Sequence, residues 1–219
     1  MKFLDKLERK FGHICIPNLM LVIVGGMGLI YIMNMLSPAA NLISRFSFFK
    51  AAILQGEIWR VLTFMFIPDA TSPIWLIFTL YFYYLIGSSL ENEWGSFKFN
   101  VFYFTGLIAT IVVGFIFGYA NTTYLNLSLF IAFAAVFPNF QVLLFFILPI
   151  KVKYLAIADG VLLAISFLDG GFSTKCLILA AMLNLALFFG PDIYHRWKNE
   201  RQYKQVRENF RNNYNNYNN

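Results

Sequence analysis

The chain has 219 residues, of which 59% are hydrophobic, 19% aromatic and only 13% charged. An average soluble domain carries about 25% charged residues, so this composition excludes an ordinary soluble domain and also a disordered chain. Its two cysteines are too few for a disulfide framework. The net charge of +6 could suit nucleic acid, but in so apolar a chain Lys and Arg more often set membrane topology. We therefore expect a helical protein that crosses a membrane several times and binds no nucleic acid.

Six apolar segments are candidates for membrane-spanning helices. Residues 17–35, 73–90 and 97–119 approach or exceed the length that crosses about 30 Å of hydrocarbon. The other three, at residues 124–137, 154–168 and 176–189, are shorter, so they should lie among other helices or in locally thin bilayer. The fold class predicted is an all-α membrane protein, a six-helix bundle with a long membrane-associated first loop. Helix stops follow the last three segments, at Phe137-Pro138, Asp169-Gly170-Gly171 and Gly190-Pro191.

The charges predict how the chain is organised across the membrane. Six helices place both termini on one side, and 13 of the Lys and Arg residues then share that side against 4 on the other. This excess predicts cytoplasmic termini, and the absence of organellar signals favours a bacterial plasma membrane. No cleaved signal peptide is expected, because no small-residue cleavage site follows the first apolar segment. The predicted domains are a cytoplasmic amphipathic segment (1–14), a membrane domain (15–191) and a basic, Asn-rich cytoplasmic tail (192–219).

The first loop, residues 36–72, is long and apolar. We expect it to lie in the outer interface of the bilayer, with Trp59 at the depth of the lipid headgroups. Arg60 would be an expensive charge there unless it is paired. Glu57 stands one helical turn earlier, and loop carbonyls can accept the remaining guanidinium protons. Arg60 is therefore predicted to hold the fold together and not to act in chemistry.

Three motifs resemble those of the rhomboid superfamily. Residues 57–63, EIWRVLT, are similar to the Trp-Arg motif of its first loop. Residues 90–99, LENEWGSFKF, followed by Tyr103 and Gly106, resemble its junction of helices two and three. Phe137-Pro138 with the following residues 142–149 is similar to the stretch between helices four and five. The resemblance implies a six-helix rhomboid-like bundle, with structural motif residues Glu57, Trp59, Arg60, Glu91 and Gly95.

Active rhomboids are intramembrane serine endopeptidases, and the resemblance implies where their nucleophile would stand. The family uses a serine in a Gly-x-Ser-Gly motif near the outer end of helix four, and this chain has no such motif. The spacing from Phe137-Pro138 places residues 121–124, including Thr123, opposite it. An alternative register offers Asn126 and Ser128, so Ser128 is the candidate nucleophile if any exists. Both are predicted to face the bundle.

The general base is the other half of the family's catalytic pair. The chain's two histidines, His13 and His195, lie outside every predicted span. Asn184 stands where the family pattern has histidine in helix six, and an amide cannot act as a general base. Asp159 is the only acidic residue within a predicted span, so no aspartyl pair can form, and the metalloprotease motif is absent. The pattern is that of a pseudoprotease, similar to the Derlin branch of the superfamily.

Three hypotheses for function follow. The first is an inactive rhomboid-like protein that binds transmembrane segments of client proteins and locally perturbs the bilayer. The second is an atypical active intramembrane serine protease, which would use Ser128 or a threonine. The third is a small transporter component with Asp159 beside a wet path. The expected partners are lipids and transmembrane segments, with no cofactor or metal. The intramembrane polar residues to examine are Thr123, Asn126, Asp159 and Asn184.

Overall fold

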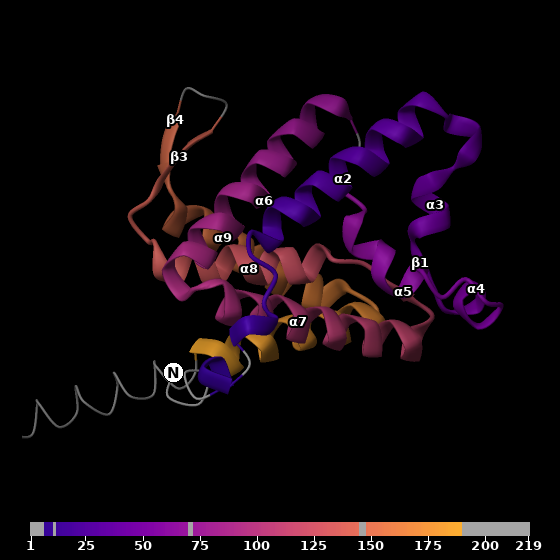
Figure 1. Ribbon diagram of the computed structural model, residues 1–219. Helices are drawn as coiled ribbons and strands as arrows, with labels where there is room; N and C mark the ends of the chain where they lie inside the picture. Colours follow the sequence, from indigo (N-terminus) through magenta and orange to yellow (C-terminus); the bar gives the residue numbers. More distant parts are fainter. Residues whose placement is uncertain (1–6, 11, 70–71, 145–147, 190–219) are drawn as a thin grey trace, which may run out of the picture.

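A computed structural model of the chain describes residues 7–10, 12–69, 72–144 and 148–189. These residues form a bundle of helices (Figure 1). Within these described ranges, four helices are long and apolar enough to cross a membrane. They are Gly12–Leu36, which contains η1 (Gly12–Ile14) and α2 (Leu19–Leu36), then α6 (Pro73–Trp94), α7 (Ser96–Phe117) and a final helix, Phe172–Phe189, here called the last helix.

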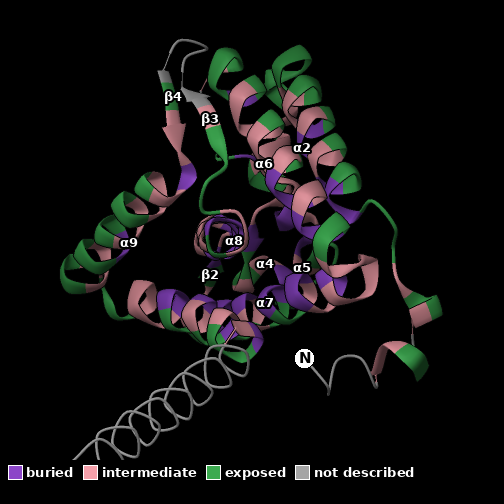
Figure 2. Ribbon diagram, turned by 90° about the vertical axis from the view of Figure 1, so that its left-hand side faces the viewer, coloured by how far each residue is buried: buried purple, intermediate pink, exposed green. Residues whose placement is uncertain are grey.

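Two further helices complete the bundle. The apolar helix α8 (Thr123–Val136) has only 14 residues, whereas α9 (Val152–Asp169) has 18 but carries three charged side chains. Figure 2 shows α8 end-on in the middle of the molecule, with α6, α7 and α9 around it, and α8 contacts all three. Asn126 and Ser128 of α8 are 5% and 0% exposed. The prediction that this short helix is enclosed, with both side chains facing the bundle, is confirmed.

Among the described residues a helix occupies each of the six predicted segments, four of them long and apolar enough to cross a membrane, but the lengths correct one expectation. Of the three segments predicted to be short, only α8 is. The helices α9 and Phe172–Phe189 have 18 residues each, about 27 Å at 1.5 Å per residue. Both begin before the apolar run does, because Lys153 and Lys175 interrupt the run without interrupting the helix. Long lysine side chains can cover apolar surface while their charge reaches the interface.

Local signals set the helix ends. Ser72 caps α6 by accepting a hydrogen bond from the Trp75 amide at 3.5 Å, and Pro73 takes the first helical position, where its missing N–H costs nothing. Gly95 separates α6 from α7 with a φ of 85°, a conformation that favours glycine. The predicted stops at Phe137-Pro138 and Gly170-Gly171 are confirmed.

The first loop folds into several short elements. They are η2 (Pro38–Ala40), α3 (Leu42–Phe46), β1 (Phe48–Phe49), α4 (Lys50–Leu54), α5 (Arg60–Thr63) and η3 (Phe64–Phe66). Strand β1 pairs antiparallel with β2 (Tyr119–Ala120), which ties the loop to the connection between α7 and α8. The fully buried Phe48 ring packs edge-on against Phe64 and Phe115. The loop is therefore part of the folded core.

A hairpin and the N-terminal segment adjoin the helices of the bundle. An antiparallel hairpin of β3 (Gln141–Leu144) and β4 (Leu148–Lys151) connects α8 to α9 and projects from the bundle (Figure 1). Near the N-terminus, Glu8 forms an ion pair of 3.5 Å with Lys98 on α7. Residues 1–6 and 11 of the predicted amphipathic segment, and all of the predicted tail at 192–219, lie outside the described residues.

Candidate functional site

Ser128 is the candidate nucleophile that the resemblance of the sequence to rhomboids suggests. Its side chain is fully buried, and its hydroxyl donates a hydrogen bond to the Leu125 carbonyl at 2.7 Å. A backbone carbonyl cannot accept the serine proton as a base would. A serine hydroxyl is a weak nucleophile without such a base. The contact is the ordinary one by which a serine inside a helix satisfies its hydroxyl group.

Asn184, at the position of the family's histidine, packs against α7. Its amide donates to the Phe102 carbonyl at 3.0 Å, and its Oδ1 lies 2.9 Å from the Thr105 hydroxyl. Gly106 makes this approach possible. A Cβ there would lie 2.4 Å from Leu125 Cδ1 and 2.8 Å from Asn184 Nδ2. Asn184 therefore joins the last helix to α7, and none of the hydrogen bonds found among the described residues links it to Ser128.

The chain's two histidines and its candidate metal ligands bear on whether this centre could be reactive. His13 is exposed in η1, before α2, and His195 lies outside the described residues. Within the described part of the chain, no group of three His, Cys, Asp or Glu side chains could hold a metal ion.

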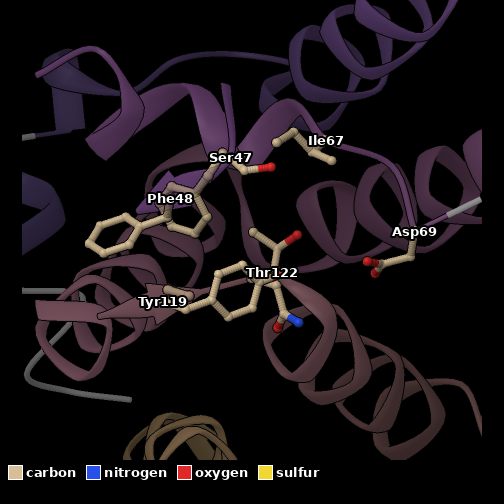
Figure 3. Close-up of a pocket in the computed structure, with 9 residues that line it drawn as sticks. Ser47, Phe48, Ile67, Asp69, Tyr119 and Thr122 are labelled. Atoms are coloured by element: carbon tan, nitrogen blue, oxygen red, sulfur yellow. The ribbon is translucent and has the colours of Figure 1, made fainter. Parts of the chain in front are cut away.

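A small cavity lies where α8 begins, on the side of the first loop. Its volume is about 50 Å³, which is room for a few water molecules. Figure 3 shows Phe48 and Ile67 of the first loop facing Tyr119 and Thr122, with Asp69 at the edge. Besides these, Ser47, Phe64, Ala120 and Asn121 line it.

Polar groups converge at this cavity. Thr122 is 2% exposed, and the buried Oδ1 of Asn121 has no hydrogen-bond partner. Thr123 donates its hydroxyl proton to Asp69 Oδ1 at 3.1 Å. Although Asp69 as a whole is exposed, loss of water around its carboxyl group raises its pKa, and the hydrogen bond from Thr123 opposes the rise. The sequence indicated Thr123, but Asp69 was missed because 54 residues separate the two.

A second set of polar side chains lies within the bundle. Asn126 donates through Nδ2 to Thr122 Oγ1 at 3.4 Å, but its Oδ1 is buried without a partner. The same holds for the Tyr103 hydroxyl on α7 and for Oδ2 of Asp159 on α9. The hydroxyl of Tyr83 on α6 interacts electrostatically with Asp69 of the first loop. It also interacts with the Asn126 side chain, and electrostatically with Asp159 and Tyr103. The sequence indicated Asn126 and Asp159 but not the two tyrosines, which are hidden among many aromatic residues.

The first-loop motif residues form an ion pair in which Arg60 is buried and the Glu57 side chain is partly exposed, and backbone carbonyls support it. Arg60 is 7% exposed, and its Nε donates to the Glu57 carboxylate as predicted. Its Nη1 donates to the carbonyls of Ser44 at 2.6 Å and Ser47 at 2.9 Å. Trp59 is 50% exposed. The guanidinium group thus fastens α5 to the segment between α3 and β1.

The motif at the junction of α6 and α7 fastens the start of α2. Glu91 is buried and accepts hydrogen bonds of 2.7 Å from the Asn18 amide and from the Ser96 hydroxyl. Asn100, which the sequence did not indicate, accepts from the Ile16 amide at 3.0 Å and donates to the Ile16 carbonyl at 2.9 Å. An asparagine within an apolar helix was the available signal. Both contacts are structural, because every polar group in them is paired.

The fold and the buried polar groups define an integral membrane protein built as a helical bundle. A family model for the Rhomboid domain matches residues 55–173, which is 119 of the 219 residues. The match includes both structural motifs and most of the residues that line the cavity, except Ser47 and Phe48, and it ends just inside the last helix. The chain belongs to the rhomboid family. A search of curated proteins found no match.

Proposed function

We propose that this rhomboid-family protein is catalytically inactive, and that it binds transmembrane segments of client proteins and locally perturbs the bilayer. The observation that carries the proposal is the state of the two positions where the family's catalytic pair would stand. Ser128 is fully buried and its hydroxyl donates a hydrogen bond to a backbone carbonyl, whereas the amide of Asn184 donates to a carbonyl of α7. Neither group can activate the other, since an amide is no general base.

The arrangement in the membrane forms part of the proposal. We place all six helices across a bacterial plasma membrane, with both termini cytoplasmic, because of the 13 to 4 distribution of Lys and Arg. The domain limits are those of the sequence, with the membrane domain at residues 15–191. Helices of 18 residues reach about 27 Å, and α8 with 14 residues only about 21 Å. Since hydrocarbon is about 30 Å thick, the lipid beside α9 and the last helix would thin slightly, which supports a local perturbation of the bilayer. The enclosed α8 does not contribute to this thinning, because other helices surround it.

One observation favours the second candidate, an atypical intramembrane protease. The Thr123 hydroxyl donates to the Asp69 carboxylate beside a water-sized cavity at the start of α8. A hydroxyl paired with a carboxylate whose pKa is raised is a possible nucleophile and base. The pair therefore belongs in any test of catalysis.

The experiment reconstitutes the purified protein in liposomes with a panel of single-span substrates, and follows cleavage and photo-crosslinking together. We expect crosslinks and no cleavage products. Asn184→His, which restores the family's residue type, should also yield no products, since the Ser128 hydroxyl still donates its hydrogen bond to the Leu125 carbonyl.

The controls identify the nucleophile if products appear. Ser88→Ala removes a hydroxyl that also donates to a preceding carbonyl, that of Tyr84 at 2.6 Å. Products that vanish in Ser128→Ala or Thr123→Val, and persist in Ser88→Ala, would show that the protein is a protease. Absence of both products and crosslinks would contradict the binding function.

A further inference from the structure

Unpaired polar atoms are concentrated in one place within the bundle. Among the described residues, four buried side-chain polar atoms have no hydrogen-bond partner, and three of them belong to Tyr103, Asn126 and Asp159. Together with Tyr83 these residues are called the mid-bundle cluster. They come from four helices, α6, α7, α8 and α9, and Tyr83 interacts with each of the other three.

The depth of the mid-bundle cluster makes unpaired atoms expensive. Tyr83, Tyr103 and Asp159 stand well within their helices, away from both ends. Asn126 is 5% exposed and Tyr103 is 0% exposed. More than about 90% of buried polar groups in folded proteins are paired, and hydrocarbon offers no substitute partner. Three unpaired groups on helices that pack together, each belonging to a residue that interacts with Tyr83, indicate a partner that is supplied from outside the bundle.

The chemistry of the orphans specifies that partner. Asn126 Oδ1 and an ionised Asp159 can only accept hydrogen bonds, so they require a donor. Lys153 of α9 and Lys175 of the last helix do not supply it. Lys153 Nζ lies 5.0 Å from the centre of the Tyr154 ring, and Lys175 Nζ lies 6.0 Å from the Phe167 ring. An aromatic ring such as those of Tyr83 and Tyr103 favours a cation over a neutral donor.

We infer that the mid-bundle cluster receives the ammonium or guanidinium group of a Lys or Arg side chain carried by a bound transmembrane segment. The inference rests on the proposed function and names the feature of the client that is recognised. Access is consistent with the packing, since α6 and α9 both contact α8 but make little contact with each other. Asp159 itself is half-buried, with only one oxygen shut off from solvent and unpaired. A lysine on a segment lying against this side could extend its long side chain inward.

The test measures binding of designed single-span peptides in liposomes of phosphatidylethanolamine and phosphatidylglycerol, by energy transfer to the labelled protein. The peptides share a Leu-Ala span and differ only at the central residue, which is Lys, Leu or Glu. We expect the Lys peptide to bind about tenfold more tightly than the Leu peptide, as for one charge-assisted hydrogen bond. The Glu peptide should bind more weakly than either.

Asp159→Asn keeps the shape of the side chain and removes its charge, so it should reduce the preference for Lys to about twofold or less. Asp169→Asn is the matched control, because Asp169 is an exposed residue at the far end of the same helix. It should leave the tenfold preference intact.

Each outcome decides between the two proposals. If the wild-type protein binds the Lys, Leu and Glu peptides equally, client binding stands and the mid-bundle cluster is not a recognition site. A preference for Lys that survives in Asp159→Asn also overturns the inference. If no peptide binds, the proposed function fails and the inference fails with it. Because the comparison of Lys with Glu uses only wild-type protein, it remains decisive even if Asp159→Asn does not fold.

Discussion

Replacing Arg60 by alanine should destabilise the protein without touching any candidate chemical group. The guanidinium group is 7% exposed and connects three parts of the first loop. Two of its contacts go to the carbonyls of Ser44 and Ser47, and the third goes to the carboxylate of Glu57. Alanine leaves both carbonyls and the carboxylate without this donor.

The expected loss of stability follows from these contacts. A hydrogen bond to a charged group contributes about 1.5 to 3 kcal/mol. Since Ser44 is exposed and Ser47 only half-buried, water can replace part of each contact, and the lower value applies to both carbonyls. The side chain of Glu57 is 40% exposed, so its ion pair adds less than about 1 kcal/mol. The total is about 3 kcal/mol, or a fall in Tm of about 6 to 12 °C for a chain of this size.

Thermal unfolding in detergent measures the effect, with Arg45→Ala as the matched control. Arg45 lies in the same loop, on α3, and is exposed, so its replacement should shift Tm by no more than about 1 or 2 °C. Arg60→Lys should fall between wild type and Arg60→Ala, because an ammonium group cannot span both carbonyls and the carboxylate as the guanidinium fork does. The reasoning fails if Arg60→Ala retains the wild-type Tm, or if Arg45→Ala loses as much.

Two further predictions concern packing and pH. Gly106→Ala should lower the free energy of unfolding by about 1 to 3 kcal/mol, because a Cβ there overlaps side chains of α8 and the last helix. Gly160 has open space around it, so Gly160→Ala should not lower the free energy of unfolding in the same detergent assay. Asp69→Asn should raise Tm at pH 7, because a pKa raised above 3.8 by folding means that ionisation of this carboxyl group destabilises the fold. That gain should shrink as the pH falls through the raised pKa of the folded state, and it should vanish only well below 3.8, where the carboxyl group of the wild type is protonated in both states. A gain that grows on acidification would contradict the assignment.

Local signals explain what the sequence predicted well. The helix positions follow from apolar runs and from stops such as Phe137-Pro138, which act within a few residues. The Glu57–Arg60 pair was predictable for the same reason, since residues three apart lie on one face of a helical turn. The lengths of α9 and the last helix were underestimated because a run of apolar letters ends at Lys153 or Lys175, while the backbone helix does not.

Contacts between distant residues explain what the sequence could not predict. Asn100 pairs with Ile16 across 84 residues, and Asn184 pairs with Phe102 across 82. No periodicity or spacing links such positions. The pairing of β1 with β2 and the cavity beside Asp69 likewise exist only after the helices have packed. Polar residues in the apolar helices could be noticed one by one, but not which of them meet.

The polar groups inside the bundle fall into two kinds, and the difference bears on function. Asn100 and Asn184 have both their amide oxygen and nitrogen paired, so they join helices and strengthen the fold. Asn126 and Asp159 each keep a buried oxygen without a partner, which lowers the stability of the fold. Apolar side chains of similar size at these positions would make the fold more stable. Proteins commonly retain such a loss of stability at sites that bind or react. In this chain the residues that carry the two unpaired oxygens and the unpaired Tyr103 hydroxyl each interact with Tyr83, whereas Ser128, the candidate nucleophile from the sequence, is hydrogen-bonded within its own helix. If the proposed function holds, the unpaired groups within the bundle, more than Ser128, are therefore where a bound segment would find polar partners.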